Sequence, residues 1–261
     1  MQALYIASIG MSAQERNVEV ISNNIANMRT TGYKKQRAEF QDLLYQSYRR
    51  AGASTSDQGT MVPAGVEIGS GVKTAATPRI MSQGSVSPTE KELDIAIQGE
   101  GFFAIQLPDG RTAYSRDGSF ERSDTGEIVT VDGYQLQPGI TIPDGATGVS
   151  ISADGLVEAF MPADTEPTQI GQIQIARFVN KAGLESIGDN LFRETASSGP
   201  AQTGTPNEDG MGNLMQGYLE MSNVNAVTEI ADLIAAQRAY EMNARVVSAG
   251  DQMLQATSQL R

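Results

Sequence analysis

"LYIASIGMSAQERNVEVISNNIANM", residues 4–28, places apolar side chains seven residues apart along its whole length. A spacing of seven keeps side chains on one side of an α-helix, as in a coiled coil. We therefore predict one helix from about residue 3 to about residue 29, ended by Gly32 in a left-handed conformation. Its apolar stripe consists of Leu4, Ala7, Met11, Val18, Ile21, Ile25 and Met28, with Gln14 as the polar exception.

Three asparagines, Asn23, Asn24 and Asn27, flank the end of this stripe. Each costs the helix roughly 0.5 kcal/mol relative to alanine, so their presence needs a reason. An amide donates and accepts hydrogen bonds at once, so identical helices could bond to one another there without meeting like charge. We therefore expect neighbouring copies of the chain to approach at these amides.

Residues 222–260 carry two adjacent heptad series on one predicted helix, capped by Asn223 or Asn225. One series consists of Ala226, Leu233, Tyr240, Val247 and Leu254. The other consists of Ala239, Val246, Met253 and Leu260, with Ala235, Met242, Ala249 and Ala256 between the two. Because each series needs a partner, the pattern predicts two neighbours for this helix.

The sequence between the two helices alternates and turns in the manner of β-hairpins. Turn signals at 108–110, 124–126 and 154–155 separate alternating apolar runs, and "IGQIQIARFVN", residues 170–180, adds another strand. We predict a mainly β central domain of antiparallel hairpins, flanked by helices that form a coiled-coil-like core in a polymer. The expected parts are an N-terminal helix at 1–32, an extended arm or linker at 33–74, a β-rich outer domain at 75–205, a return linker at 206–222 and a C-terminal helix at 223–261.

The net charge of −12 is unevenly spread over the 261 residues. Residues 63–221 hold nine Lys or Arg against 22 Asp or Glu, a net charge of −13, whereas the segments before and after carry +2 and −1. Near-neutral ends can pack copy against copy, and an acidic middle disfavours nucleic acid. Because the chain has no cysteine and no histidine, disulfides, catalytic thiols, imidazole triads and most zinc sites are excluded.

Two features could suggest chemistry, and each has a structural explanation. Gly99 and Gly101 form a GxG pair, but no third glycine or helix signal follows, which favours a bulge or tight bend over a phosphate cradle. Four acidic residues could be imagined as a calcium site or a glycosidase pair, yet each lies in or beside a glycine-containing turn. They are Asp117, Asp124, Glu127 and Asp132. We expect no catalytic, cofactor or metal site.

No apolar run approaches the length of a membrane-spanning helix, and the start of the chain lacks the basic region of a conventional signal peptide. We therefore expect no membrane insertion and, if the protein is exported, a route without a cleaved signal peptide.

The heptads leave two interpretations open. Each helix could pack on its own domain, or the helices could be adhesive surfaces for other copies, because they carry more apolar surface than one partner covers. We favour the second. The predicted self-assembly residues are Leu4, Met11, Val18, Ile21, Asn24, Ile25 and Met28 in the first helix, and Ile230, Leu233, Tyr240, Val247 and Leu254 in the last.

Three separated motifs, in order, resemble the signatures of the flagellar rod, hook and hook-associated axial proteins. They are "ISNNIANMRTTGYKKQRAEFQDLLYQ" at 21–46, "GEGFFAI" with "YSRDGSF" at 99–120, and "GYLEMSNVNAVTEIADLIAAQRAYEMNARVVSAGDQML" at 217–254. The length, and "YQSYRRAGASTSDQGTMVPAGVEIGSGV" at 45–72, are most similar to the distal-rod members of this family.

The resemblance implies a structural subunit, not an enzyme, that leaves the cell through the flagellum's type III export apparatus. It implies assembly into a straight helical tube that transmits torque and encloses the export channel, within the basal-body rod crossing the periplasm. Implied partners are copies of the chain, proximal-rod and hook subunits, and the surrounding peptidoglycan-associated and outer-membrane rings. The arm after the first helix would keep the tube straight, here through Tyr48, Arg49, Arg50, Met61 and Pro63.

Two alternatives remain at this stage. A hook or proximal-rod subunit of the same family would share the motifs, and a carbohydrate-active β protein would use the acidic turns.

Overall fold

A computed structural model describes residues 2–52, 63–162 and 166–259 of the chain. The chain divides into two compact units. Unit 1 contains the chain up to Ile25, Gln36–Pro78 and the chain from Asn225 onward, and unit 2 contains Ala26–Lys35 and Arg79–Val224. Each unit is therefore built from segments that are far apart in the sequence.

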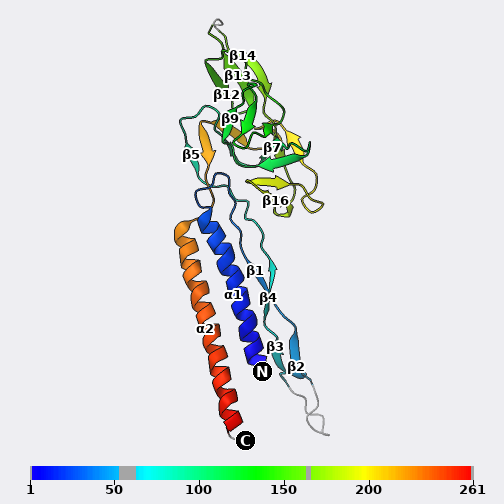
Figure 1. The fold of residues 1–261 in the computed structure, drawn as a ribbon. Coiled ribbons are helices and arrows are strands. Elements are labelled where there is room, and N and C mark those ends of the chain that lie inside the picture. The colour runs from blue at the N-terminus through cyan, green and yellow to red at the C-terminus, as the bar shows by residue number, and fades with distance from the viewer. Residues whose placement is uncertain (1, 53–62, 163–165, 260–261) are drawn as a thin grey trace. The chain divides into compact units, whose positions relative to one another are not determined.

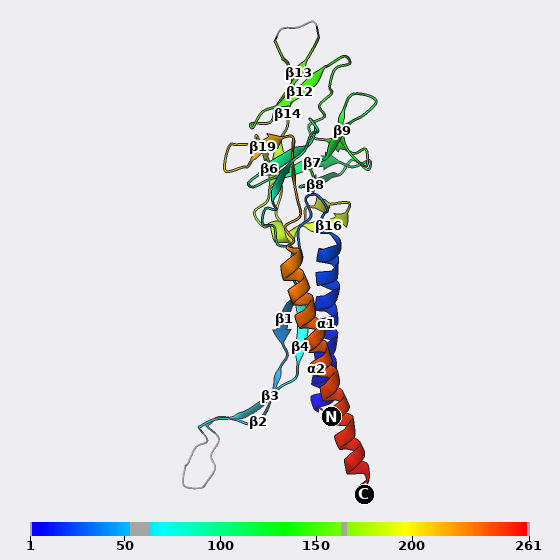
Figure 2. The same cartoon turned by 90° about the vertical axis from the view of Figure 1, so that its left-hand side faces the viewer.

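Two long helices dominate the described part of unit 1. They are α1, Gln2–Ala26, and α2, Ala226–Gln259, and they lie side by side (Figures 1 and 2). Together with the antiparallel strands of unit 2, they confirm the predicted fold class of terminal helices around a mainly β region. Neither described helix has a stretch apolar enough to span a lipid bilayer.

Helix α1 ends at Ala26, earlier than the predicted residue 29. The chain turns instead, with the Thr30 amide bonded to the Asn27 carbonyl. Gly32 then adopts a left-handed φ of 67°, as predicted, and a Cβ there would lie 2.6 Å from the Asp117 amide nitrogen. A side chain at this position would therefore be both strained and obstructed.

The two candidate caps of α2 have separate roles. Asn225 Oδ1 accepts hydrogen bonds from the amides of Val227 and Thr228, which makes Asn225 the N-cap. Asn223 lies in unit 2, where its side chain accepts from the Lys35 amide and donates to the Ile80 carbonyl. Asn223 thus joins segments of unit 2 and does not cap the helix.

The segments predicted as an arm and a return linker contain regular strands. In 33–74 the strands form two antiparallel pairs, β1 with β4 and β2 with β3, and in 206–222 β19 pairs with β6 and β20 with β5. Short strands without strong alternation give little sequence signal, which explains why they were expected as linkers. The unit 1 strands are β1 Glu39–Asp42, β2 Tyr45–Arg49, β3 Val66–Gly69 and β4 Val72–Ala76.

Unit 2 is built on a nine-stranded antiparallel sheet, in which β16, β17, β8, β7, β11, β10 and β9 follow one another, β15 pairs with β7, and β18 pairs with β15. A three-stranded sheet has the order β12, β13, β14. The strands are β5 Val86–Pro88, β6 Ile95–Gln98, β7 Phe102–Gln106, β8 Thr112–Ser115, β9 Phe120–Arg122, β10 Ile128–Thr130, β11 Gln135–Leu136, β12 Gly148–Ile151, β13 Leu156–Phe160, β14 Thr168–Gln172, β15 Ile175–Arg177, β16 Glu185–Gly188, β17 Leu191–Arg193, β18 Gln202–Gly204, β19 Asn213–Gln216 and β20 Tyr218–Glu220, with a 3-10 turn at Lys181–Gly183.

The three predicted hairpins are confirmed. The turns at 108–110, 124–126 and 154–155 join β7 to β8, β9 to β10 and β12 to β13, and each pair is antiparallel. The prediction of one strand over 170–180 is wrong, because β14 and β15 divide it and pair with different sheets. Alternation of apolar residues does not reveal where a chain changes sheets.

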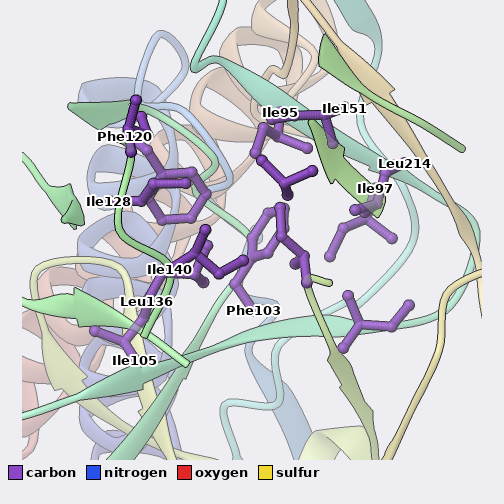
Figure 3. Close-up of a cluster of buried hydrophobic side chains, with 14 of the residues drawn as sticks. Ile95, Ile97, Phe103, Ile105, Phe120, Ile128, Leu136, Ile140, Ile151 and Leu214 are labelled. Carbon is purple, nitrogen blue, oxygen red and sulfur yellow. The ribbon is translucent and has the colours of Figure 1, made fainter. Parts of the chain in front are cut away.

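The core of unit 2 explains the doubled phenylalanine of "GEGFFAI". Because successive side chains on a strand point to opposite faces, Phe103 enters the main core and Phe102 the opposite side of β7. The Phe103 and Phe120 rings meet edge to face, with centroids 5.1 Å apart, among buried isoleucines and leucines (Figure 3). Phe102 joins Phe178 and Phe192 in a second, aromatic cluster. Both faces of the strand are thereby covered.

Candidate self-assembly surface

The pairing of α1 with α2 in unit 1 depends on glycines that let the helices approach closely. A Cβ on Gly250 would lie 2.5 Å from Leu4 Cδ2, and a Cβ on Gly10 would lie 2.9 Å from the side-chain Nδ2 of Asn243. Ala7 and Ala236 are buried in the same unit. One side of each helix is thus covered by the other helix of its own chain.

Asn24 is a buried structural amide, with 1% of its surface exposed. Its Nδ2 donates to the Gln36 carbonyl at 2.8 Å and to Glu229 Oε2 at 3.1 Å, and its Oδ1 accepts from the Gln36 amide at 2.9 Å. It therefore joins the end of α1, the segment that follows and the start of α2. These contacts occupy the Asn24 side chain within its own subunit, and its predicted bond to a neighbouring copy stays a prediction.

The predicted residues of α1 lie mostly toward the interior of unit 1. Ile21 is buried within the subunit, with 5% of its surface exposed, and its role in self-assembly stays a prediction. Leu4, Met11, Val18 and Ile25 are half-buried, and Met28, in unit 2, is exposed. Seven-residue spacing identified the apolar face of α1, but α2 of the same chain covers part of that face.

The predicted residues of α2 divide between a covered and an open side. Leu233 and Val247 are half-buried, whereas Ile230, Tyr240 and Leu254 are 44–49% exposed. Glu229, four residues after the cap of the helix, is buried against Asn24. Of the first heptad series of α2, Leu233 and Val247 are therefore partly covered, whereas Tyr240 and Leu254 are open to solvent.

Helix α2 carries two further apolar stripes outside this contact. The first-half stripe consists of Val227, Ile230 and Ile234, with exposed fractions of 78%, 49% and 46%. The second-half stripe consists of Met242, Val246 and Met253, with exposed fractions of 61%, 48% and 66%. Val246 and Met253 belong to the second predicted heptad series, whose Leu260 lies outside the described residues, and Met242 is one of the residues between the two series. Contiguous exposed apolar surface of this kind is typical of protein interfaces.

The two helices also frame an open groove of about 360 Å³ within unit 1. It is lined by Val18 and Glu15 of α1 and by Gln237, Tyr240 and Glu241 of α2. Two of the predicted self-assembly residues, Val18 and Tyr240, thus line the same groove, which is open to solvent.

The predicted arm residues are accessible in unit 1. Tyr48 is 63% exposed and its hydroxyl donates to Gln2 Oε1 at 3.2 Å. Arg49, Arg50 and Pro63 are exposed, and Met61 lies outside the described residues. Leu44, just before β2, and Tyr45, Val66 and Ile68 of β2 and β3 are also exposed to solvent.

A buried ionic triad in unit 2 was missed by sequence reasoning. Glu220 accepts from Lys34 Nζ at 2.6 Å and from the Gly84 amide at 2.8 Å, and its Oε2 lies 2.9 Å from Arg116 Nε. The side chains are 0%, 1% and 5% exposed for Glu220, Lys34 and Arg116. Burial lowers the pKa of Lys34, and the Glu220 carboxylate partly opposes that effect. Each residue comes from a different one of the three sequence motifs.

The acidic turn residues are engaged in local hydrogen bonds. Asp117 Oδ1 accepts from the Ser119 amide at 3.1 Å and from its hydroxyl at 2.8 Å, and Glu127 Oε1 accepts from the Gln135 amide group at 2.9 Å. Across residues 2–52, 63–162 and 166–259, no cluster of three acidic side chains has the geometry of a metal site. Asp117 therefore stabilises its own turn, and Glu127 links the strand that follows its turn to β11.

Three family models match the chain in sequence order. "Flagella basal body rod protein" matches residues 4–34, "Flagellar hook protein FlgE/F/G D1 domain" matches 96–159, and "Flagellar basal body rod FlgEFG protein C-terminal" matches 215–260. Lys34, Arg116 and Glu220 lie one in each matched region.

Several full-length relatives share one description. The flagellar basal-body rod protein FlgG of Caulobacter vibrioides is 59% identical over 261 residues, which cover 100% of both chains. Proteins of the same description are 50% identical in Agrobacterium fabrum, over 97% of each chain, and 47% identical in Borreliella burgdorferi, over 100% of this chain and 99% of the relative.

Proposed function

Because the chain belongs to the flagellar basal-body rod proteins, as a structural subunit of the rod, we propose that it builds the distal rod as a straight helical tube of its own copies. The tube transmits torque and encloses the export channel. In this proposal α1 and α2 form the inner layers, α2 is nearer the channel, and the β unit faces outward.

The observation that carries the proposal is the surplus apolar surface of α2. Leu233 and Val247 of its first heptad series are half-buried, whereas the first-half and second-half stripes remain exposed. Burying apolar surface contributes about 25 cal/mol per Å², so several exposed side chains on each subunit supply a strong drive to assemble. A second copy is a fitting occupant because residues 222–261 carry a net charge of only −1.

The predicted self-assembly residues divide into two roles under this proposal. Ile21 and Asn24 hold α1 in place within the subunit, and Leu233 and Val247 pack toward α1. Ile230, Tyr240 and Leu254 contact neighbouring copies, together with the two stripes. Leu4, Met11, Val18, Ile25 and Met28 contribute their exposed portions.

The arm is proposed to contact neighbouring subunits and keep the tube straight. Its exposed Tyr48, Arg49 and Arg50 suit a surface that is acidic, since residues 63–221 carry a net charge of −13. Proximal-rod and hook subunits at the two ends of the tube, and the surrounding ring proteins, are proposed partners.

The experiment is a pair of substitutions to glutamate on the same helix. Val246→Glu places a charge in the second-half stripe, and Gln252→Glu places the same charge at an exposed polar position. We expect Val246→Glu to block polymerisation of concentrated protein, measured by sedimentation and negative-stain microscopy, while Gln252→Glu still forms straight tubes. Equal polymerisation by both variants would remove the stripe from the proposal.

The alternatives are disfavoured by particular observations. Similarity to proteins described as FlgG extends over the whole chain, which favours the distal rod over a hook or proximal-rod subunit. A carbohydrate-active β protein would use the acidic turn residues as its catalytic carboxylates, whereas Asp117 accepts hydrogen bonds from Ser119 and Glu127 accepts one from Gln135.

A further inference from the structure

A polar hollow of about 130 Å³ opens beside the buried triad of unit 2. Three cationic side chains line it, Lys34, Arg116 and Lys181, and the acidic side chain in the lining is Glu100. The segment Gly99–Phe102 forms another part of the wall. The hollow is therefore electropositive, although the protein as a whole is acidic.

The charges around the hollow do not cancel. Glu100 pairs with Lys181, which is 28% exposed at the rim. Glu220 contacts both Lys34 and Arg116, so one carboxylate faces two buried cations. One positive charge is left without a carboxylate among the described residues, at side chains that are at most 5% exposed. Burying an uncompensated charge costs several kcal/mol, which a bound anion would reduce.

The two buried cations also retain unused hydrogen-bond donors. Arg116 Nη1 donates to the carbonyls of Gly99 and Gly101, and its Nε contacts Glu220. Within the part of the chain that the structure describes, Arg116 Nη2 has no hydrogen-bond acceptor. Lys34 Nζ donates to Ser82 and Glu220, which leaves one of its three hydrogens unused.

We propose that this hollow binds one small oxyanion, a carboxylate or a phosphate, between Lys34, Arg116 and Lys181. An ammonium and a guanidinium edge are the donors that carboxylate and phosphate oxygens prefer. A water molecule takes up roughly 30 Å³ of liquid, so the hollow has room for an ion of the size of acetate or phosphate.

The acidity of the rest of the protein does not prevent this. At physiological ionic strength, exposed charges farther than about 8 Å are largely screened. The ion would bind where residues 34, 116 and 220 bring the three matched regions of the chain together, so it would stabilise the folded state of unit 2.

The test uses full-length protein below its polymerisation concentration, with sodium phosphate or sodium acetate exchanged for sodium chloride at constant ionic strength. Two variants remove a cation from a surface pair. Lys181→Gln removes the cation at the rim, and Lys91→Gln removes the partner of Glu121 from a more exposed pair elsewhere on unit 2. The readouts are the thermal unfolding midpoint and the NMR shifts of the Gly99 and Gly101 amides.

We expect saturating phosphate to raise the midpoint of the wild type and of Lys91→Gln by about 3 °C. In Lys181→Gln the anion should bind about fivefold more weakly, because one partly exposed charge is worth about 1 kcal/mol. Equal midpoint shifts in all three proteins, without saturable NMR shifts, would overturn the proposal, because general salt effects act on every variant alike.

A second arm identifies the source of the anion in the assembled state. If an acidic side chain of a neighbouring copy occupies the hollow in the polymer, phosphate competes with it. Phosphate should then raise the critical concentration for polymerisation of the wild type but not of Lys181→Gln. If a free anion stays bound, phosphate should leave that concentration unchanged in both.

Discussion

Replacing Glu220 with glutamine tests whether the buried triad holds unit 2 together. The substitution keeps the size and shape of the side chain, so it leaves no cavity. It removes the negative charge that lies 2.6 Å from Lys34 Nζ and 2.9 Å from Arg116 Nε. Two cations, each at most 5% exposed, would then be buried without a carboxylate.

The expected loss follows from that burial. Removing one partner of a buried ion pair costs about 3–5 kcal/mol, because the remaining charge is uncompensated. Domains are typically stable by about 5–15 kcal/mol, so Glu220→Gln should remove much of the stability of unit 2. For a domain of this size, we expect the thermal midpoint to fall by about 10 °C.

The control is Glu185→Gln, which removes the partner of Arg193 from a pair that is also short, 2.7 Å, but 53% exposed at the carboxylate. An exposed pair of this kind is worth less than about 1 kcal/mol. Near-UV circular dichroism follows the tyrosines of the full-length monomer through unfolding. If Glu220→Gln loses no more stability than Glu185→Gln, the triad is not what stabilises the meeting point of the three motifs.

Three further predictions concern the same connections. Burial lowers the pKa of Lys34 in the folded state, so the unfolded chain keeps this proton at pH values where the native protein has lost it. The free energy of unfolding of the wild type should therefore rise relative to that of Lys34→Met as the pH increases toward about 10.4. A difference between the two proteins that does not change with pH would contradict this. Burial raises the pKa of Tyr114 and acts in the opposite sense, but equally in both proteins. Gly32→Ala should cost about 2–4 kcal/mol in thermal unfolding, because φ is 67° and a Cβ would lie 2.6 Å from the Asp117 amide nitrogen; a loss below about 1 kcal/mol would refute the obstruction. Deleting residues 47–63 should give polymers that bend under negative-stain microscopy, and straight tubes from the deleted protein would count against the proposed role of the arm.

Local sequence patterns predicted most of the fold. Seven-residue spacing predicted the helices, and turn residues between alternating runs predicted the hairpins. Each of these signals is formed by residues that are close together in the sequence. Strands β19 and β20 are short and gave no such signal. Their pairing with β6 and β5 depends on residues more than one hundred positions earlier.

The polar contacts of Asn24 and Lys34 could not be predicted either, because their partners are far away in the sequence. Asn24 and Glu229 are 205 residues apart, and Lys34 and Glu220 are 186 apart. A heptad series states which residues share a face of a helix, but it does not state which neighbour covers that face. Ile21 is therefore buried inside its own unit, while Val246, with the same spacing pattern, remains open.

The most direct test of the central claim measures access to Val246 before and after polymerisation. Because the chain contains no cysteine, Val246→Cys carries a unique thiol. Val246 is 48% exposed, so the thiol should react readily with a maleimide reagent in the monomer. We predict that it loses most of this reactivity in the polymer, where a neighbouring copy covers the second-half stripe. A thiol that reacts as fast in straight tubes as in the monomer would contradict the account.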